Sequence, residues 1–374
     1  MKKIIILGGG MVGGTMAHDL AGDFHVTVAD RDATRLSELK SKLSIETIEA
    51  DLSQADAVRS AIAPADLVIG AVPGFMGFET MRTVIDAGKN IVDISFYPED
   101  PFALEALAKE RGVVAVMDCG VAPGISNLSL GYYNTQFDLN GFRCLVGGLP
   151  RVRRWPYEYK APFSPIDVIE EYLRPARYVR DGEEVIMPAL SEPEPIDFED
   201  IGTLEAFNTD GLRSLIKTVP LPDMIEKTLR YPGHIEKMRM LRESGFFSEK
   251  AMDVKGTSIR PIDVTTALLF PIWKLNPEDE EFTVMRIELW GEKAGQDIKV
   301  QIDMLDRGKG GLSSMARTTG YPCTGTARLV LDGLFNRVGI SPPEFVGAAE
   351  GCFDKLMAYQ RERGIDYKIE IQSI

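Results

Sequence analysis

Short apolar runs alternate with amphipathic segments through the first third of the chain. The runs are β-branched and nearly all apolar, as strands buried on both faces should be, and they predict strands at 3–7, 25–29, 44–49, 67–72, 90–94 and 113–117. Helical patterns lie between them, at 12–21, 34–42, 54–63, 77–87 and 101–110. Strands that alternate with helices in this way predict a doubly wound α/β fold with a parallel sheet.

The rest of the chain has a different pattern. Segments 282–290 and 297–305 alternate apolar and polar residues, and 291–296 reads as a hairpin loop, so we expect a second α+β domain with an antiparallel or mixed sheet. Residues 150–195 are rich in Pro, Tyr and Arg without a sustained period, which favours a loop-rich segment facing a ligand or an interface. A helical pattern returns at 321–337, and Pro342-Pro343 is expected to break the chain near its end.

Composition and charge argue against several classes of function. The 374 residues carry 42 Lys+Arg against 56 Asp+Glu, a formal net charge of −14, which argues against non-specific binding to nucleic acid or to an anionic membrane surface. The apolar runs are far shorter than the roughly 20 residues that span a bilayer. Four cysteines without a C-x-x-C pair and three histidines without a cluster predict neither a disulfide framework nor a metal site. We therefore expect a soluble, cytoplasmic protein.

The first predicted strand runs directly into Gly8-Gly-Gly-Met-Val-Gly13, which opens a helix. This is G-x-G-x-x-G between a strand and a helix, the context in which the motif binds a dinucleotide. Gly8 permits the tight turn, Gly10 lets the backbone approach a pyrophosphate, and Gly13 lets helix and strand pack closely. The pyrophosphate is then expected at the helix N-terminus, where unpaired N–H groups favour an anion. The motif predicts a Rossmann domain.

Two neighbouring residues bear on the choice of dinucleotide. Asp30 ends the second predicted strand, where a carboxylate accepts hydrogen bonds from the adenosine ribose hydroxyls and repels a 2′-phosphate. Arg31 follows it and could instead hold that phosphate, so NAD is favoured and NADP remains possible. The predicted cofactor-binding residues are Gly8, Gly10, Met11, Val12, Gly13, Asp30, Arg31, Asp51, Leu52, Ala71, Val72 and Pro73.

Candidate catalytic residues follow the later strands, because ligands bind at the carboxyl ends of parallel strands. Asp93 and Asp118 follow the fifth and sixth strands, where each could stabilise a cationic amine, take its proton, or simply cap the next loop. Tyr97 and Cys119 are plausible pocket walls. No residue in the sequence pattern would activate Cys119 as a covalent nucleophile.

Several blocks resemble a known family. The run Asp118-Cys-Gly-Val-Ala-Pro-Gly-Ile-Ser-Asn127 resembles the loop after the nucleotide domain in the saccharopine dehydrogenase superfamily. Four more blocks look like successive family blocks in the expected order, at 146–150, 190–195, 204–211 and 227–234. Glu205-Ala-Phe and Thr228-Leu-Arg-Tyr-Pro-Gly-His look closer to lysine 6-dehydrogenase than to saccharopine reductase, whereas Asn208-Thr-Asp210 and the Arg-rich 151–154 differ from both.

The resemblance implies oxidation of an amino acid at a C–N bond, with L-lysine oxidised at its ε-carbon as the favoured reaction. That reaction needs a carboxylate clamp, for which we choose Arg230 because a guanidinium can bind a carboxylate through two parallel hydrogen bonds. Arg230 could equally be a structural partner of Glu205 or Glu226. His234 has an unperturbed pKa of about 6.5 that suits acid–base work, although a packing or surface role is as plausible. The aromatic set Trp155, Tyr157, Tyr159 and Phe163 is more typical of packing or an interface.

The predicted organisation is a dinucleotide-binding domain at 1–122 and a catalytic and oligomerisation domain at 123–312. From the resemblance, 313–374 should pack back on the first domain, and a homodimer is expected. Two other functions remain open. A saccharopine-type reductase must hold a second dicarboxylate arm, for which Arg151, Arg153 and Arg154 are candidates. A non-catalytic nucleotide-sensing protein should lack convergent polar groups at the strand ends.

Overall fold

The computed structural model describes residues 1–162, 165–276 and 278–373 and forms two compact units. Unit 1 comprises Met1–Asp138 and Ala316–Asp366, and unit 2 comprises Leu139–Met315 and the segment from Tyr367 onwards. The sequence predicts boundaries at 122 and 312, with the whole C-terminal segment on the first domain. The last strand, β18 (Tyr367–Ser373), instead pairs with β16 (Gln296–Arg307) of unit 2, whose edge offers unpaired backbone groups.

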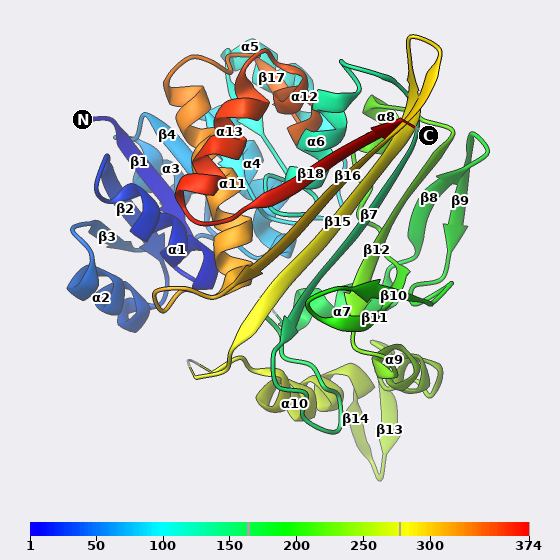
Figure 1. Ribbon diagram of the computed structural model, residues 1–374. Helices are drawn as coiled ribbons and strands as arrows, with labels where there is room; N and C mark the ends of the chain where they lie inside the picture. The colour runs from blue at the N-terminus through cyan, green and yellow to red at the C-terminus, as the bar shows by residue number, and fades with distance from the viewer. Residues whose placement is uncertain (163–164, 277, 374) are drawn as a thin grey trace. The chain divides into compact units, whose positions relative to one another are not determined.

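Unit 1 is built on a seven-stranded sheet in the order β17-β6-β5-β4-β1-β2-β3, with every pair parallel (Figure 1). The order reverses at β1, the crevice where ligands bind in such sheets. This sheet confirms the predicted doubly wound α/β fold. Its strands are β1 (Lys3–Leu7), β2 (His25–Asp30), β3 (Glu46–Glu49), β4 (Leu67–Gly70), β5 (Ile91–Asp93), β6 (Val114–Val116) and β17 (Gly339–Ser341).

The strand residues form a dry core because both faces of the sheet are covered. Ile5, Leu7, Val68 and Ile91 are buried in one cluster with side chains from the crossover helices. Asp32 caps the second helix, where its carboxylate accepts a hydrogen bond from the backbone N–H of Arg35. The helices of unit 1 are α1 (Met11–Leu20), α2 (Ala33–Lys42), α3 (Ala55–Ile62), α4 (Gly74–Asp86), η1 (Pro101–Leu104), α5 (Glu105–Arg111), α6 (Ile125–Tyr133), α11 (Ser314–Leu331), α12 (Pro343–Ala348) and α13 (Cys352–Glu362).

The seventh strand was not expected from the sequence. β17 has only three residues, too few to show a period, and it lies beside β6 at the edge of the sheet. The Pro342-Pro343 pair that we expected to break the chain instead starts α12, with a proline at the first helical position. α11 also begins seven residues before the predicted helix at 321.

Unit 2 contains a nine-stranded mixed sheet, with β10-β11-β12-β7-β15-β16-β18 in order and β8 and β9 attached beside β12. β12 runs parallel to β7 and antiparallel to β11. β15 and β16 form the predicted hairpin, and their alternate residues, including Ile287, Leu289 and Ile302, are buried. The remaining strands of the sheet are β7 (Asp138–Pro150), β8 (Ala176–Arg180), β9 (Glu183–Met187), β10 (Glu194–Phe198), β11 (Gly202–Asn208), β12 (Asp223–Arg230) and β15 (Glu281–Lys293).

The segment 150–195 is less loop-rich than its composition predicts. It contains α7 (Pro165–Leu173), β8, β9 and the start of β10. These elements are short, and their prolines lie at helix starts and strand ends, so local composition overstated the irregular structure. The other elements of unit 2 are α8 (Leu215–Thr218), α9 (His234–Glu243), α10 (Pro261–Trp273) and a separate hairpin of β13 (Met252–Val254) and β14 (Thr257–Ile259).

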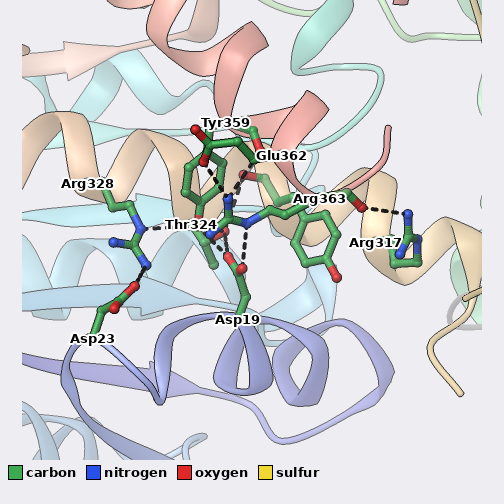
Figure 2. A network of polar contacts seen from close by, with 9 residues as sticks. Asp19, Asp23, Arg317, Thr324, Arg328, Tyr359, Glu362 and Arg363 are labelled. Atoms are coloured by element: carbon green, nitrogen blue, oxygen red, sulfur yellow. Dashed lines mark hydrogen bonds and ion pairs between the residues drawn. The ribbon is translucent and has the colours of Figure 1, made fainter. Parts of the chain in front are cut away.

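A polar network joins the C-terminal helix α13 to α1 (Figure 2). The Asp19 carboxylate on α1 accepts hydrogen bonds from the Arg363 Nε, the Tyr359 hydroxyl and the Thr324 hydroxyl, each at 2.5 Å. The Arg363 guanidinium also lies over the Tyr359 ring, 3.2 Å from its centroid. Because the Asp19 side chain is only 6% exposed, one buried carboxylate holds three partners together.

We expect Asp19→Asn to lower the free energy of unfolding by about 3 kcal/mol, because it removes the buried carboxylate that pairs with the mostly buried Arg363 guanidinium and leaves only the more distant, exposed Glu362. Asp23→Asn is the matched control. Asp23 pairs with Arg328 at 2.6 Å, but its side chain is 60% exposed, so its loss should cost less than about 1 kcal/mol. Denaturant unfolding of both variants measures the difference, and equal losses would show that Asp19 does not hold the helices together.

Candidate active site

The glycine turn of unit 1 has the shape of a dinucleotide cradle. Gly8 adopts φ +113°, and a Cβ on it would lie 2.3 Å from the Ala71 carbonyl oxygen at the end of β4. A Cβ on Gly13 would lie 2.0 Å from the Gly8 carbonyl oxygen, so strand and helix can approach only because both residues lack side chains. Gly10, the residue before α1, has no atom of the described chain within 4 Å of its Cβ position apart from its own neighbours in sequence. The open position lies beside the N-terminal N–H groups of α1, which fits a pyrophosphate.

An acid and a base flank this turn. The Asp30 carboxylate accepts hydrogen bonds from the backbone N–H of Gly9 at 2.6 Å and of Asp32 at 2.9 Å, which fixes its negative charge beside the turn. Arg31 is exposed. Arg35 was not expected from the sequence; it lies in the first turn of α2, and its Nε donates to the Gly9 carbonyl oxygen at 3.0 Å. Arg35 reaches Gly9 only because β1, which precedes the glycine turn, is paired with β2, which precedes α2.

The other predicted cofactor residues lie at the ends of β1, β3 and β4. The backbone N–H of Ala71 donates to the Leu7 carbonyl at 2.9 Å, so the ends of β1 and β4 are adjacent. Val72 is buried, and Pro73 precedes α4. Leu52 is part of the core, whereas Asp51 is exposed and hydrogen bonds from Ser53 lower the pKa of its carboxyl. Met11 is partly exposed at the start of α1, and Val12 follows it.

The structure brings Asp93 and Cys119 together at the ends of β5 and β6. The Cys119 backbone N–H donates to the Asp93 carbonyl oxygen at 2.9 Å. The buried Asp93 carboxylate accepts from the Ser95 backbone N–H at 2.8 Å, which is the loop-capping role left open by the sequence. Asp118 is buried with φ +52°.

Two candidates at these strand ends are less suited to chemistry. Burial raises the pKa of the Cys119 thiol to about 12, and its Sγ lies 3.2 Å from the Thr326 hydroxyl, so Cys119 is a protonated thiol at neutral pH. Tyr97 is completely buried, packs edge-on against Phe78, and directs its hydroxyl at the Met81 sulfur. Tyr97 is therefore a core residue of unit 1 and not the pocket wall that we expected.

In unit 2, Arg230 ends β12 and is only 2% exposed. Its Nη2 lies 2.6 Å from Glu171 Oε2 on α7, which is neither of the acids expected from the sequence. Its Nε donates to the Tyr172 hydroxyl at 3.2 Å, and its Nη1 donates to the Leu229 carbonyl at 3.0 Å. With most of its five N–H groups engaged, Arg230 cannot offer a ligand the two parallel donors of the clamp that we expected.

His234 continues a hydrogen-bond chain from Arg230. Its Nε2 lies 3.0 Å from the Tyr172 hydroxyl, and its Nδ1 lies 2.9 Å from the Tyr157 carbonyl oxygen. Because a carbonyl only accepts, Nδ1 carries the proton and Nε2 accepts from Tyr172. Burial and the Arg230 charge lower the pKa of His234 to about 3, so the ring is neutral at physiological pH and does not serve as the expected acid–base group.

The unexpected neighbours of Arg230 are aromatic. Tyr159 lies under the guanidinium, 4.5 Å from ring centroid to Cζ, and Trp273 meets Tyr159 edge-on at 5.5 Å. The sequence places Tyr157 and Tyr159 in a packing cluster, and they do pack, but around a buried charge. Phe163 lies outside the described residues. Glu171 and Tyr172 lie on α7, in a segment that the sequence predicts to be loop-rich, and carried no signal of a site.

Across residues 1–162, 165–276 and 278–373, no group of three or more His, Cys, Asp or Glu residues could hold a metal ion. In the same residues, no helix combines the length and hydropathy needed to cross a membrane.

Both parts of the chain match one protein family. Residues 4–116 match the model described as the saccharopine dehydrogenase NADP binding domain, and residues 120–365 match the saccharopine dehydrogenase C-terminal domain. Apo saccharopine dehydrogenase (L-Glu forming) from Saccharomyces cerevisiae has the same fold, with a TM-score of 0.81 and 21% identity over 100% of each chain.

Similar proteins of known name are distant in sequence. Alpha-aminoadipic semialdehyde synthase of Rattus norvegicus is 22% identical over 91% of this chain, which spans only 45% of that protein. Saccharopine dehydrogenase [NADP(+), L-glutamate-forming] of Saccharomyces cerevisiae is 23% identical, with 91% of this chain and 94% of that protein covered. Carboxyaminopropylagmatine dehydrogenase of Synechocystis is 22% identical, with 91% and 92% covered.

We expect Gly10→Ala to fold normally and to lose at least about tenfold in affinity for the dinucleotide, because the added methyl fills the place of the pyrophosphate without touching the protein. Gly22→Ala is the control, since its Cβ also meets nothing within 4 Å but lies outside the turn. Quenching or enhancement of bound NADH and NADPH fluorescence measures the affinity. Unchanged binding in Gly10→Ala would contradict the assignment of the cradle.

We expect His234 to make stability depend on pH. The unfolded state takes up a proton at His234 below pH 6.5 and the native state only near pH 3, so the stabilisation is complete above 6.5 and is lost as the pH falls towards 3. For His234 alone, the free energy of unfolding should fall by about 2 kcal/mol between pH 8 and pH 5. Denaturation at both pH values should show this loss in the wild type and in the exposed control His18→Gln, and a smaller loss in His234→Gln. Equal losses in all three would rule out a depressed pKa.

Proposed function

This chain belongs to the saccharopine dehydrogenase family, and from that premise we propose that it is an NAD(P)-dependent oxidoreductase acting on the C–N bond of an amino acid, with L-lysine oxidised at its ε-carbon. The observation that carries the proposal is the open cradle at Gly10, in a chain whose two parts both match the family. The resemblance of Glu205-Ala-Phe and Thr228–His234 to lysine 6-dehydrogenase supports lysine as the substrate.

The chemistry supplied by a bound nicotinamide is acceptance of a hydride from the carbon that carries the amine. The amine must first be neutral, although free lysine has a pKa of about 10.4. We propose that a carboxylate oxygen of Asp93 or Asp118 takes this proton, because both side chains are buried at the ends of β5 and β6. Water then adds to the oxidised carbon and ammonia leaves, which yields the semialdehyde.

Asp30 and the two arginines near it support different nucleotides. The carboxylate of Asp30, held against the backbone N–H of Gly9, disfavours a 2′-phosphate and supports NAD. Arg31 and Arg35 are the nearby cations for NADP, the nucleotide in the description of the matching family domain. We propose that the chain accepts NAD in preference to NADP.

The rival function, a saccharopine-type reductase, has less support in unit 2. It needs cations for a second dicarboxylate arm, and the three candidate arginines are each within ion-pair distance of an acid: Arg151 of Glu280, Arg153 of Glu158 and Arg154 of Asp279. A homodimer and a cytoplasmic location stay predictions.

The deciding experiment follows absorbance at the reduced-nicotinamide band with L-lysine or saccharopine, each with NAD and with NADP. We expect turnover of lysine, with kcat/KM for NAD about tenfold or more above that for NADP because of the Asp30 charge. Turnover of saccharopine alone would establish the reductase. Absence of turnover with every amine, together with intact nucleotide binding, would establish a nucleotide-sensing protein.

A further inference from the structure

The aromatic residues around Arg230 form a cation cage that the protein fills with its own guanidinium. The Arg230 Cζ lies 4.5 Å from the Tyr159 ring centroid, 5.9 Å from that of Tyr172 and 6.0 Å from that of Phe207. Ring faces attract cations, so this guanidinium is held by electrostatics as well as by hydrogen bonds. Because Arg230 fills the cage, a ligand cation does not bind inside it. A ligand must instead be recognised by the charged partner of Arg230 that reaches the surface.

That partner is Glu171. Its side chain is 27% exposed while that of Arg230 is 2% exposed, so a ligand meets the carboxylate before the guanidinium. Arg230 engages Oε2, and Oε1 has no hydrogen-bond partner among the described residues. Because each carboxylate oxygen accepts two hydrogen bonds, Oε1 is a fixed acceptor whose position the ion pair sets.

The charges near Glu171 favour a cation over an anion. His234 is neutral because its pKa is lowered to about 3, and Tyr172 is neutral because burial raises its pKa to about 12. Burial raises the pKa of the Glu171 carboxyl, the Arg230 guanidinium opposes this rise, and the negative charge of Asp167, one turn earlier on α7, adds to it. Arg230 is therefore the only positive charge in contact with the Glu171 carboxylate among the described residues, and a second carboxylate arriving at this surface would be repelled.

An unsatisfied donor in the same cluster points to a ligand with an acceptor as well. Trp273 is completely buried, and its indole Nε1–H has no hydrogen-bond partner among the described residues. Its ring meets those of Tyr159 and Tyr172 edge-on, at 5.5 Å and 6.3 Å. Buried N–H groups are nearly always paired, so this donor can take an acceptor that the described residues do not supply. An α-amino acid carries an ammonium group and a carboxylate on the same carbon.

We propose that Glu171 binds the α-ammonium group of the amino-acid substrate and thereby selects α-amino acids over amines that lack this group. This assignment rests on the proposed function and adds that unit 2 recognises the α-ammonium group of the substrate. Glu171 is assigned to the ammonium that does not react, because its ion pair with Arg230 favours its carboxylate form, whereas the amine on the carbon that loses a hydride must be neutral. Glu171 is thus a specificity-determining residue, and the proton acceptor of the reaction lies elsewhere.

The experiment compares L-lysine with 6-aminohexanoate, which has the same reacting amine and carboxylate but no α-ammonium group. For Glu171→Gln we expect binding and kcat/KM with lysine to fall about 10- to 100-fold, the effect of one charged hydrogen bond, and values for 6-aminohexanoate to change by less than about twofold. Glu171→Asp, which keeps the charge but withdraws it by one methylene, should cause a smaller loss with lysine alone.

The matched control is Glu170→Gln, which removes the same charge from the preceding residue of α7. Glu170 is 46% exposed and pairs with Arg174 at 3.8 Å, so both ligands should bind as in the wild type. Far-UV circular dichroism and denaturant unfolding report whether each variant has folded, because the substitutions lie in unit 2 and nucleotide binding in unit 1 does not report on its folding. If Glu171→Gln misfolds, the test uses two other measurements: the loss of lysine binding in Glu171→Asp, and the preference of the wild type for lysine over 6-aminohexanoate.

The possible results separate this inference from the proposed function. Equal losses for both ligands in Glu171→Gln, or a gain with lysine, would overturn the inference while lysine turnover by the wild type still supports the function. Calorimetry that shows lysine binding lost in Glu171→Gln, without wild-type turnover, would support the inference and overturn the function. Wild-type protein that neither binds nor oxidises lysine would overturn both.

Discussion

The close approach of backbones at the glycine turn is the constraint on which the nucleotide-binding unit depends. β1, the start of α1 and the end of β4 meet where a side chain on Gly8 or Gly13 would overlap a carbonyl oxygen. This contact sets where the N-terminus of α1 points, and with it the N–H groups that face an anion. The Asp30 carboxylate then ties β2 to the same turn through the backbone N–H of Gly9.

In the second unit, the organising feature is a buried charge. Arg230 is removed from water and is stabilised by Glu171, by aromatic ring faces and by the hydroxyl of Tyr172. A guanidinium so satisfied is a poor free clamp, but it orients a carboxylate, and its charge adds to the effect of burial in lowering the pKa of His234. The cluster around Arg230 is therefore better described as a set of fixed hydrogen-bond donors and acceptors than as a group of acids and bases.

Secondary-structure predictions from the sequence were correct where they depended on residues close together in the chain. The six predicted strands and the hairpin of β15 and β16 depend on periodicity or on residues a few positions apart. The three-residue strand β17 and the short elements in 150–195 carried too little local signal. Arg35 and Glu171 were missed because only the folded chain brings them to Gly9 and Arg230.

The sequence by itself determined the nucleotide-binding unit and the family, because a glycine turn between a strand and a helix is a local requirement of backbone geometry. It also identified Arg230 and His234 as residues of interest. The tertiary structure decided what these residues can do. Partners on α7 and β12 engage the N–H groups of Arg230, and burial together with the Arg230 charge keeps His234 neutral. Desolvation and hydrogen bonding depend on neighbours in space, and no spacing along a chain encodes them.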